Sequence, residues 1–214
     1  EGRGVAPDGM VAFEDDAFMD WMLSYYDANG DGYLSTEEAL AVKKIYIGFD
    51  ETIEGAVPVK SLKGIEYCKN LEELECDFNA ITSLDLSGLS KLTLVDCSYN
   101  LLKEVKLAGC TSLMQYYGNV NESLESLDFK DCPNIQMIQA YKNALKTFDV
   151  SGLQKLVYAD VNQNSITTLD VKGCPALKIL NCGSNSLETL ALKDLPSLMS
   201  LGCYRNNLSS IDLS

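Results

Sequence analysis

The sequence contains no histidine among its 214 residues. Histidine is the commonest general base in enzymes and the usual partner of serine and cysteine nucleophiles. Its absence excludes Ser–His and Cys–His catalysis as well as every histidine-based metal site. The chain also has neither a GxxxxGK phosphate-binding loop nor a GxGxxG dinucleotide fingerprint. The sequence therefore offers none of these common signatures of an enzyme.

Basic residues and long apolar runs are also scarce. Lys and Arg number 17 against 31 Asp and Glu, which gives a formal net charge of −14 and argues against a nucleic-acid partner. No run of 18 apolar residues occurs, so the sequence predicts no membrane span. Hydrophobic residues still make up 46% of the chain, which is ample for a core. The chain begins at Glu1 and not at Met, so we expect a product whose targeting segment has been removed.

The segment 27–38, DANGDGYLSTEE, has the spacing of a calcium-binding loop. Oxygen donors occupy all six ligand positions, and Gly32 stands where such a loop must turn sharply. The predicted ligands are Asp27, Asn29, Asp31, the Tyr33 carbonyl, Ser35 and Glu38. Carboxylates held close together repel each other unless a cation joins them. We therefore predict one structural Ca²⁺ ion, and the alternative is an acidic turn that binds no metal.

Both flanks of this loop are predicted to be helical. The preceding segment has apolar residues at i, i+3, i+4 and i+7, which is one face of a helix. These residues are Phe18, Trp21, Met22 and Tyr25. The following segment opens with Ser35 and Glu38 at capping-box spacing and is expected to continue as a helix to Val42. The sequence thus predicts an EF-hand-like helix–loop–helix and a cap strand in residues 13–58, preceded by a flexible segment at 1–12.

From residue 71 onward the chain repeats with a period of 21 residues and a single 22. Seven units, the last one incomplete, carry the pattern LxxLxCxxNxLxxLxL with other small or apolar residues at some positions. A period of this length is typical of a solenoid of stacked coils. The second half of each unit alternates apolar and polar residues, which suits a second short strand. We therefore expect short parallel strands on both sides of a narrow stack.

One asparagine keeps its place in every unit. The seven residues are Asn79, Asn100, Asn121, Asn143, Asn164, Asn185 and Asn206. A polar residue fixed inside an apolar frame needs hydrogen-bond partners, and stacked coils can supply them. We expect each amide to bond the backbone of its own coil and of the next, so that the asparagines form a ladder.

Spacing, apolar frame and asparagine together resemble the leucine-rich-repeat family over residues 71–213, with a weaker match from Val59. The resemblance implies a solenoid over residues 59–214, with the LxxLxC segments forming a concave parallel sheet. The chain is similar to secreted bacterial leucine-rich-repeat proteins, including internalin-like ones, which carry helical amino-terminal caps. That likeness implies a secreted protein or one anchored at the bacterial cell surface. The calcium loop departs from the simplest internalin cap, and we interpret the ion as a staple of the cap that covers the first coil.

The eight cysteines follow the repeat register. Four occupy a position where other units carry Gly, Ala or Val, and most of the rest occupy a position of Leu. In-register side chains on parallel strands point the same way, which strains a disulfide torsion. We therefore expect free thiols packed as small hydrophobes.

The outward positions of the concave strands are the predicted binding surface. Acidic residues gather in the first units, at Glu73, Glu75, Asp77 and Asp96. A catalytic carboxylate pair is conceivable there, but a solvated acidic face is favoured, and no enzyme activity is predicted. The middle units offer tyrosines bordered by amides, as protein interfaces do. The predicted partner-binding residues are Tyr117, Met137, Gln139, Tyr141, Tyr158, Asp160, Ile179, Asn181 and Tyr204.

Two functions remain open for this face. The first is a protein-binding module, in which the tyrosines grip a partner and the acidic strands select a basic patch on it. The second is a carbohydrate-binding or adhesion module, because Tyr, Asn, Asp and Gln also stack on and hydrogen-bond sugars. The alternative to both is a set of scattered surface aromatics with no partner.

Overall fold

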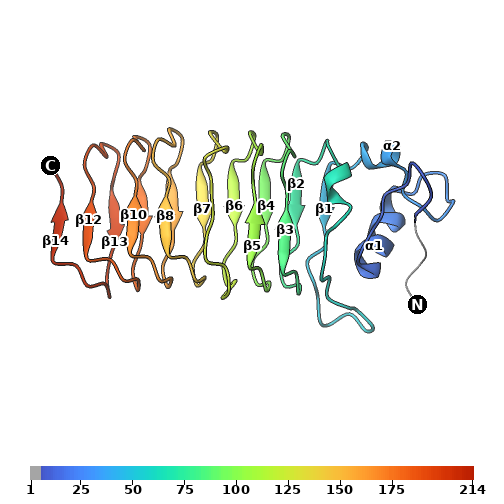
Figure 1. The fold of residues 1–214 in the computed structure, drawn as a ribbon, viewed down its shortest axis with the longest axis horizontal. Helices are drawn as coiled ribbons and strands as arrows, with labels where there is room; N and C mark the ends of the chain where they lie inside the picture. Colours follow the sequence, from blue (N-terminus) through green and yellow to red (C-terminus); the bar gives the residue numbers. More distant parts are fainter. Residues whose placement is uncertain (1–5) are drawn as a thin grey trace.

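The computed structural model describes residues 6–214 and shows a small helical segment at one end of a long stack of coils (Figure 1). One face of the stack is an eight-stranded parallel sheet with the order β1-β2-β4-β6-β7-β9-β11-β13. Its strands are β1 Lys44–Tyr46, β2 Glu73–Glu75, β4 Leu94–Asp96, β6 Gln115–Tyr117, β7 Met137–Gln139, β9 Tyr158–Asp160, β11 Ile179–Asn181 and β13 Ser200–Gly202. The predicted parallel-strand solenoid of about seven coils is confirmed, and the name concave sheet is kept below for the sheet formed by the LxxLxC segments.

The opposite face carries shorter ladders. Its strands are β3 Ser83–Asp85, β5 Glu104–Lys106, β8 Thr147–Asp149, β10 Thr168–Asp170, β12 Thr189–Ala191 and β14 Ser210–Asp212. They pair as β3–β5, β8–β10 and β12–β14. Within the described residues, the coil of 22 residues that contains β6 forms no strand on this face. The second strand face is therefore present but divided into three two-stranded ladders.

A single apolar core runs between the two faces. The central residue of each concave strand from β2 to β11 is fully buried, whereas the flanking residues are partly or fully exposed. This alternation follows from the pleat of a strand, whose successive side chains point to opposite faces. The buried central residues are Leu74, Val95, Tyr116, Ile138, Ala159 and Leu180. One side of the sheet is thus committed to the core and the other is free to meet a ligand.

Tyr116 is the largest of these central residues, and one coil is adapted to hold it. Gly118 occupies the position where several coils carry cysteine. A Cβ atom at Gly118 would lie 2.4 Å from the Tyr116 hydroxyl oxygen. The missing side chain therefore makes room for the tyrosine, whose hydroxyl lies 3.6 Å from the Cys97 sulfur and whose ring packs edge-on against Phe129.

The asparagines connect each coil to the one before it. In Asn100, Oδ1 accepts from the backbone N–H of Ile81 at 3.0 Å, and Nδ2 donates to the Cys76 and Cys97 carbonyls at 3.0 and 3.1 Å. The other six asparagines make the corresponding kind of bonds. The neighbouring coil that they reach is the preceding one and not the next, which differs from our expectation. The ladder satisfies backbone groups that the apolar interior would otherwise leave unpaired.

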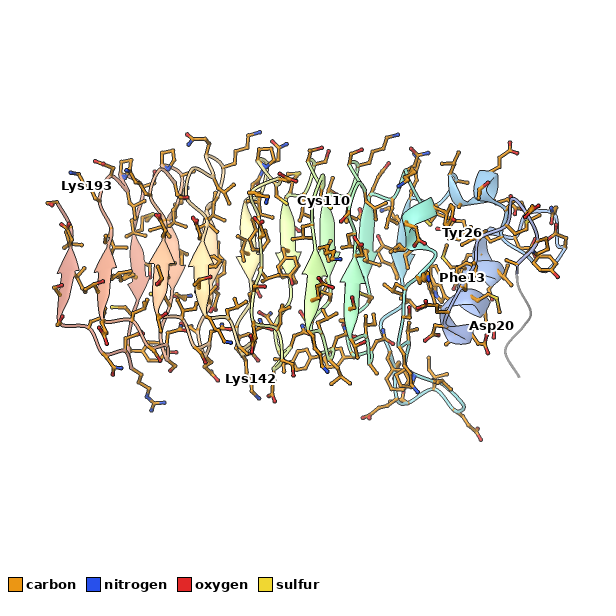
Figure 2. The ribbon with its side chains drawn as sticks, in the orientation of Figure 1. Phe13, Asp20, Tyr26, Cys110, Lys142 and Lys193 are labelled. Atoms are coloured by element: carbon orange, nitrogen blue, oxygen red, sulfur yellow. The ribbon has the colours of Figure 1, made fainter. Side chains whose placement is uncertain are left out.

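A left-handed residue precedes each asparagine of the ladder. These residues have φ angles from 50° to 58° and are Phe78, Tyr99, Val120, Lys142, Gln163, Ser184 and Arg205. The backbone N–H of Phe78 donates to the Ser98 carbonyl, and that of Tyr99 donates to the Asn119 carbonyl. Figure 2 labels Lys142 at this position on the lower edge of the stack. Since so many residue types occur there, the backbone conformation does not require any particular side chain.

The amino-terminal segment contains helix α1, Asp16–Tyr26, and the single turn α2, Thr36–Ala39. Asp15 caps α1 by accepting from the Phe18 N–H at 3.0 Å. Phe18 and Met22 are buried as predicted, but Tyr25 is 68% exposed and does not face the core. Tyr26 reaches the solenoid instead, because its hydroxyl donates to the Lys44 carbonyl at 2.7 Å.

The second predicted helix is much shorter than expected. The capping box between Ser35 and Glu38 is present, yet α2 ends at Ala39 and not at Val42. The N–H of Val42 bonds the Ala39 carbonyl, a tight i→i−3 turn. Val42 is fully buried and β1 begins two residues later, so core packing takes the chain out of the helix. The expected pair of helices is in effect one helix of 11 residues and one turn.

This segment is joined to the solenoid near the short 3-10 helix η1, Ile65–Tyr67. Asp15 connects α1 to the segment before η1, because one of its carboxylate oxygens caps the helix and the other accepts from the Lys60 N–H at 2.6 Å. Lys63 and Glu14 form an ion pair at 2.8 Å. Figure 2 shows Phe13 and Tyr26 within the part of the segment that adjoins β1.

All eight cysteines lie within the described residues and are free. Burial raises the pKa of the Cys97 and Cys182 thiols to about 12. These side chains are therefore protonated at neutral pH and pack as apolar groups, which agrees with the expectation from their register.

Candidate functional site

The concave sheet brings most of the predicted partner-binding residues into two parallel rows. Strand register places Tyr117 beside Gln139, Gln139 beside Asp160, and Asp160 beside Asn181. The second row contains Met137, Tyr158 and Ile179 in consecutive strands. Because in-register residues of a parallel sheet project to the same side, these side chains form one continuous surface. Tyr141 and Tyr204 lie beyond the strand ends, two residues after their strands β7 and β13.

Side-chain contacts within this surface hold several of its groups in place. The Tyr117 hydroxyl lies 3.1 Å from the Met137 sulfur, and the amide of Asn119 donates to the Gln139 side chain at 3.2 Å. The Tyr158 hydroxyl donates to Asp160 at 3.5 Å. Side chains that are already ordered lose less conformational entropy when a ligand binds. Several side chains of this surface are thus already ordered by their neighbours.

Tyr158 and Tyr141 of this surface have a raised pKa and are neutral at physiological pH. Burial raises the pKa of Tyr158, and the nearby Asp160 carboxylate adds to that effect. The hydrogen bond with Tyr99 raises the pKa of Tyr141. Neutral phenols can donate as well as accept hydrogen bonds, and they present large rigid apolar rings.

The first coils form an acidic region of the same face. Glu73 and Glu75 lie on β2, and Asp96 lies beside Glu75 on β4. Burial and the neighbouring carboxylate of Asp96 raise the pKa of Asp77, and burial together with neighbouring acids raises that of Glu75. Tyr46 and Lys44 hold the pKa of Glu73 below its usual value. The repulsion among these acids would be relieved by a positively charged partner.

The predicted calcium loop has a well-defined conformation. Gly30 and Gly32 adopt φ angles of 71° and 84°, which suit glycine. Asp27 accepts from both glycine N–H groups, at 2.8 and 3.0 Å. Glu38 accepts from the Ala28 N–H at 2.9 Å and from the Ser35 N–H at 2.9 Å. The bond from Ser35 contributes most to holding the pKa of Glu38 below its ordinary value.

The chemistry of the loop residues fits a hard cation, since every predicted ligand position offers oxygen. In the part of the chain that the structure describes, however, no three acidic, histidine or cysteine side chains converge into a metal-binding group. The carboxylate oxygens of Asp27 and Glu38 accept from backbone N–H groups of the loop, and three of the six predicted ligands, Asn29, Ser35 and the Tyr33 carbonyl, are not acidic. The assignment of calcium to this loop therefore rests on the spacing of the ligand positions in the sequence and on their oxygen donors.

A backbone pairing that the sequence did not predict supports the loop. The Val11 N–H donates to the Leu34 carbonyl at 2.7 Å, and the Thr36 N–H donates to the Gly9 carbonyl at 2.9 Å. Met10 and Ser35 form an antiparallel bridge. Residues 9–11 of the predicted flexible segment 1–12 are thus bonded to the loop on both sides of Ser35, while residues 1–5 lie outside the described residues.

Two exposed aromatics at the edge of the concave face were also missed. The rings of Phe78 and Tyr99 stack with centroids 4.4 Å apart and planes 9° apart. The Tyr99 hydroxyl lies 3.4 Å from that of Tyr141, which connects the pair to the predicted surface. They belong to the position just before the ladder asparagine, and alignment of the repeats at that position shows aromatics in two consecutive coils.

Comparison with known structures gives the class of fold. No protein-family model and no curated protein sequence matches the chain. The functional domain of InlJ from Listeria monocytogenes, which includes a cysteine ladder, is 26% identical, with a TM-score of 0.68 over 94% of this chain. Internalin C2 from the same organism is 21% identical, covering 88% of this chain and 93% of that one with a TM-score of 0.61. The fold is thus an internalin-like leucine-rich-repeat solenoid.

Two further structures bear on the comparison. InlP from Listeria monocytogenes is 19% identical, with a TM-score of 0.64 over 97% of this chain and 69% of that one. The LRIM1/APL1C complex, an assembly of proteins, contains a chain that is 20% identical, with a TM-score of 0.57 over 84% of this chain and 38% of that one. The present chain spans about half of the InlJ chain, 48%. Internalin-like leucine-rich-repeat folds generally act as protein-interaction modules, which agrees with the first of the two predicted functions.

None of the helices found in residues 6–214 combines the length and apolar character that a membrane span requires.

Proposed function

We propose that this chain is a non-enzymatic module that binds a protein partner on the concave sheet. The observation that carries the proposal is the continuous surface formed by Tyr117, Met137 and Tyr158 with Gln139 and Asp160 across β6, β7 and β9. Large rings bordered by amides and a carboxylate supply apolar area together with directional hydrogen bonds. Interface hot spots have this composition. The acidic first coils select a partner that offers basic groups opposite them.

A capture experiment tests this function. The purified chain is immobilised and exposed to an extracellular extract, and retained proteins are identified by mass spectrometry. We expect the double variant Tyr141→Ala/Tyr158→Ala to lose the specifically retained protein. The matched control is Thr147→Ala/Thr168→Ala, which truncates exposed residues on the opposite face. Equal retention by the two double variants would refute binding through the concave sheet.

Carbohydrate binding is the second candidate for the same surface. It is favoured by the same tyrosines and amides, which can stack on sugar rings and bond their hydroxyl groups. A glycan array probed with the wild-type chain and with Tyr141→Ala/Tyr158→Ala separates the two functions. Strong glycan signals that disappear in the double variant would replace the protein-binding proposal with this one.

Calcium in our proposal is a structural staple of the amino-terminal cap. The loop lies between α1 and α2, and α1 contacts β1 through Tyr26. An ion held by Asp27, Asn29, Asp31, Ser35, Glu38 and the Tyr33 carbonyl would offset the repulsion among three carboxylates. The ion would thereby stabilise the segment that covers the first coil. Because the loop already has many internal hydrogen bonds, we expect calcium to add stability to a folded cap.

Thermal melting with calcium and with excess chelator tests the staple. A ligand that binds only the folded state raises the melting temperature by mass action. We expect chelator to lower the wild-type melting temperature and to have no effect on Asp31→Ala. The control Glu37→Gln removes one acidic charge from the exposed side of α2 and should respond to calcium like the wild type. An unchanged wild-type melt in chelator would rule out the staple.

We further propose that the protein is secreted or anchored at the bacterial cell surface. The support is the likeness of its fold to proteins of Listeria monocytogenes that are called internalins. Cell fractionation with an antibody against the chain tests this location. Detection in the medium or by protease shaving of intact cells is the expected result, and exclusive recovery with the cytosol would contradict it.

A further inference from the structure

An open groove flanks the acidic end of the concave face. Its volume is about 550 Å³, and its lining consists of Phe49, Asp50, Glu51, Thr52, Phe78 and Tyr99. One wall is therefore formed by residues of two adjacent coils and the other by the segment that follows β1. The Phe49 N–H donates to the Asp77 carbonyl at 3.0 Å, which ties this second wall to the solenoid.

The aromatic wall is not explained by the fold. Phe78 and Tyr99 stack on each other, yet 51% and 42% of their surface remains exposed to water. Exposed apolar surface of this kind forgoes the free energy that burial would supply. The same left-handed position holds Val120, Gln163 and Ser184 in other coils. Comparison of the coils therefore shows that the left-handed backbone at this position forms without an aromatic side chain. Two exposed rings that stack on each other beside an acidic wall form a candidate interaction site.

The charge of the groove defines its ligand. Asp50 and Glu51 are the acidic residues of the lining, and none of the described residues that line it is basic. The Asp50 carboxylate accepts from the hydroxyl and the N–H of Thr52, and these bonds lower the pKa of Asp50. The carboxylate is therefore charged at neutral and mildly acidic pH. A planar cation can stack on the aromatic wall and at the same time pair with a carboxylate of the acidic wall.

We propose that this groove binds an arginine side chain of a basic segment in a protein partner, with the guanidinium stacked on the Phe78–Tyr99 pair and paired with Asp50 and Glu51. The inference rests on the proposed protein-binding function and makes it more specific. The Tyr99 hydroxyl lies 3.4 Å from the Tyr141 hydroxyl, so the groove is continuous with the concave surface. Arginine suits the site better than lysine, because a guanidinium can stack and form two parallel hydrogen bonds together.

The binding test uses a fluorescein-labelled peptide of alternating glycine and arginine and an otherwise identical peptide with citrulline in place of arginine. Citrulline keeps the size and planarity of the side chain but lacks the charge. Fluorescence anisotropy with the full chain should show at least tenfold tighter binding of the arginine peptide. Phe78→Ala and Tyr99→Ala should each weaken that binding by about threefold to tenfold.

Two matched controls separate the groove from the general negative charge of the protein. Gln163→Ala truncates the same left-handed position in another coil and should leave the affinity unchanged. Asp50→Asn/Glu51→Gln should weaken binding more than Glu188→Gln/Asp194→Asn, which removes one aspartate and one glutamate charge from exposed positions of a distant coil. Thermal melts of the aromatic variants should lie close to that of the wild type, because about half of each truncated ring is already exposed to solvent.

Several results would overturn the inference. They are equal affinity for the arginine and citrulline peptides, equal effects of Phe78→Ala and Gln163→Ala, or binding of chitotetraose that needs Phe78 without any preference for arginine. Failure here can be distinguished from failure of the proposed function. If Tyr141→Ala/Tyr158→Ala abolishes capture of a protein while Phe78→Ala changes neither capture nor peptide binding, only the groove assignment is wrong.

Discussion

Removing one asparagine of the ladder should cost more in the middle of the stack than at its end. Asn121 is fully buried, and its side chain makes three hydrogen bonds. These bonds reach the Leu102 N–H at 3.1 Å and the Cys97 and Gly118 carbonyls at 3.1 and 3.4 Å. A net value of about 1 kcal/mol for each bond gives about 3 kcal/mol for Asn121→Ala, and unsatisfied buried groups can raise the cost further.

Asn206 is the matched comparison, because it makes the same pattern of bonds in the last coil but is partly exposed. Water can replace its lost partners, so we expect Asn206→Ala to cost only about 1 kcal/mol. Urea unfolding followed by far-UV circular dichroism measures both differences, provided that the transitions remain cooperative. Equal losses for the two variants would refute the view that the ladder stabilises the solenoid by satisfying buried backbone groups.

Three further predictions concern individual side chains. Asp15→Ala removes both the cap of α1 and the bond from Lys60, and should lower the free energy of unfolding in urea by about 2 kcal/mol; a loss below 0.5 kcal/mol, roughly, would contradict this. Burial and neighbouring acids raise the pKa of Glu75, so its proton is held more tightly in the folded state. Glu75→Gln should therefore be more stable than wild type at pH 7, by at most about 0.5 kcal/mol after allowance for solvent screening, and this advantage should disappear as the pH falls through the folded pKa. Gly118→Ala should destabilise the chain by about 1–3 kcal/mol through a clash with Tyr116, and the added change Tyr116→Leu should recover most of that loss in the same assay.

The solenoid could be predicted from the sequence because the same pattern of residues recurs in seven units, so each assignment is supported several times. A single Leu or Asn says little, but Asn79 and its six equivalents fix the register of every coil. The concave strands and the rows that contain Tyr117 and Tyr158 follow from that register alone. The division of the opposite face into three ladders does not follow from the register: the coil of 22 residues separates β5 from β8, but β10 and β12 lie in consecutive coils and still do not pair.

The amino-terminal segment was predicted less well because nothing in it repeats. Helical spacing suggested Tyr25 as a core residue, whereas Tyr26 makes the contact with Lys44. The second helix was extended to Val42, although burial of that residue turns the chain toward β1. The pairing of Val11 with Leu34 joins residues far apart in the sequence, and no local pattern announces it. Tertiary contacts decided each of these points.

The groove was missed for a different reason. The outward positions of a strand can be counted from the pleat, but Phe78 and Tyr99 lie after the strands, at a left-handed residue. Their stacking depends on the spacing of adjacent coils, and Phe49 reaches them from outside the repeats. Sequence alignment of the repeats at that position would have identified the two rings, but not the second wall.

Site-specific photocrosslinking tests the central claim most directly. A photoreactive phenylalanine analogue is placed at Gln139, in the middle of the concave sheet, or at Thr147, on the opposite face. Each version of the chain is irradiated with the protein that the wild type captures, and the crosslinked products are identified by mass spectrometry. The account predicts a crosslinked complex from position 139 and none from position 147. Crosslinking from position 147 alone would place the partner on the other face and contradict it.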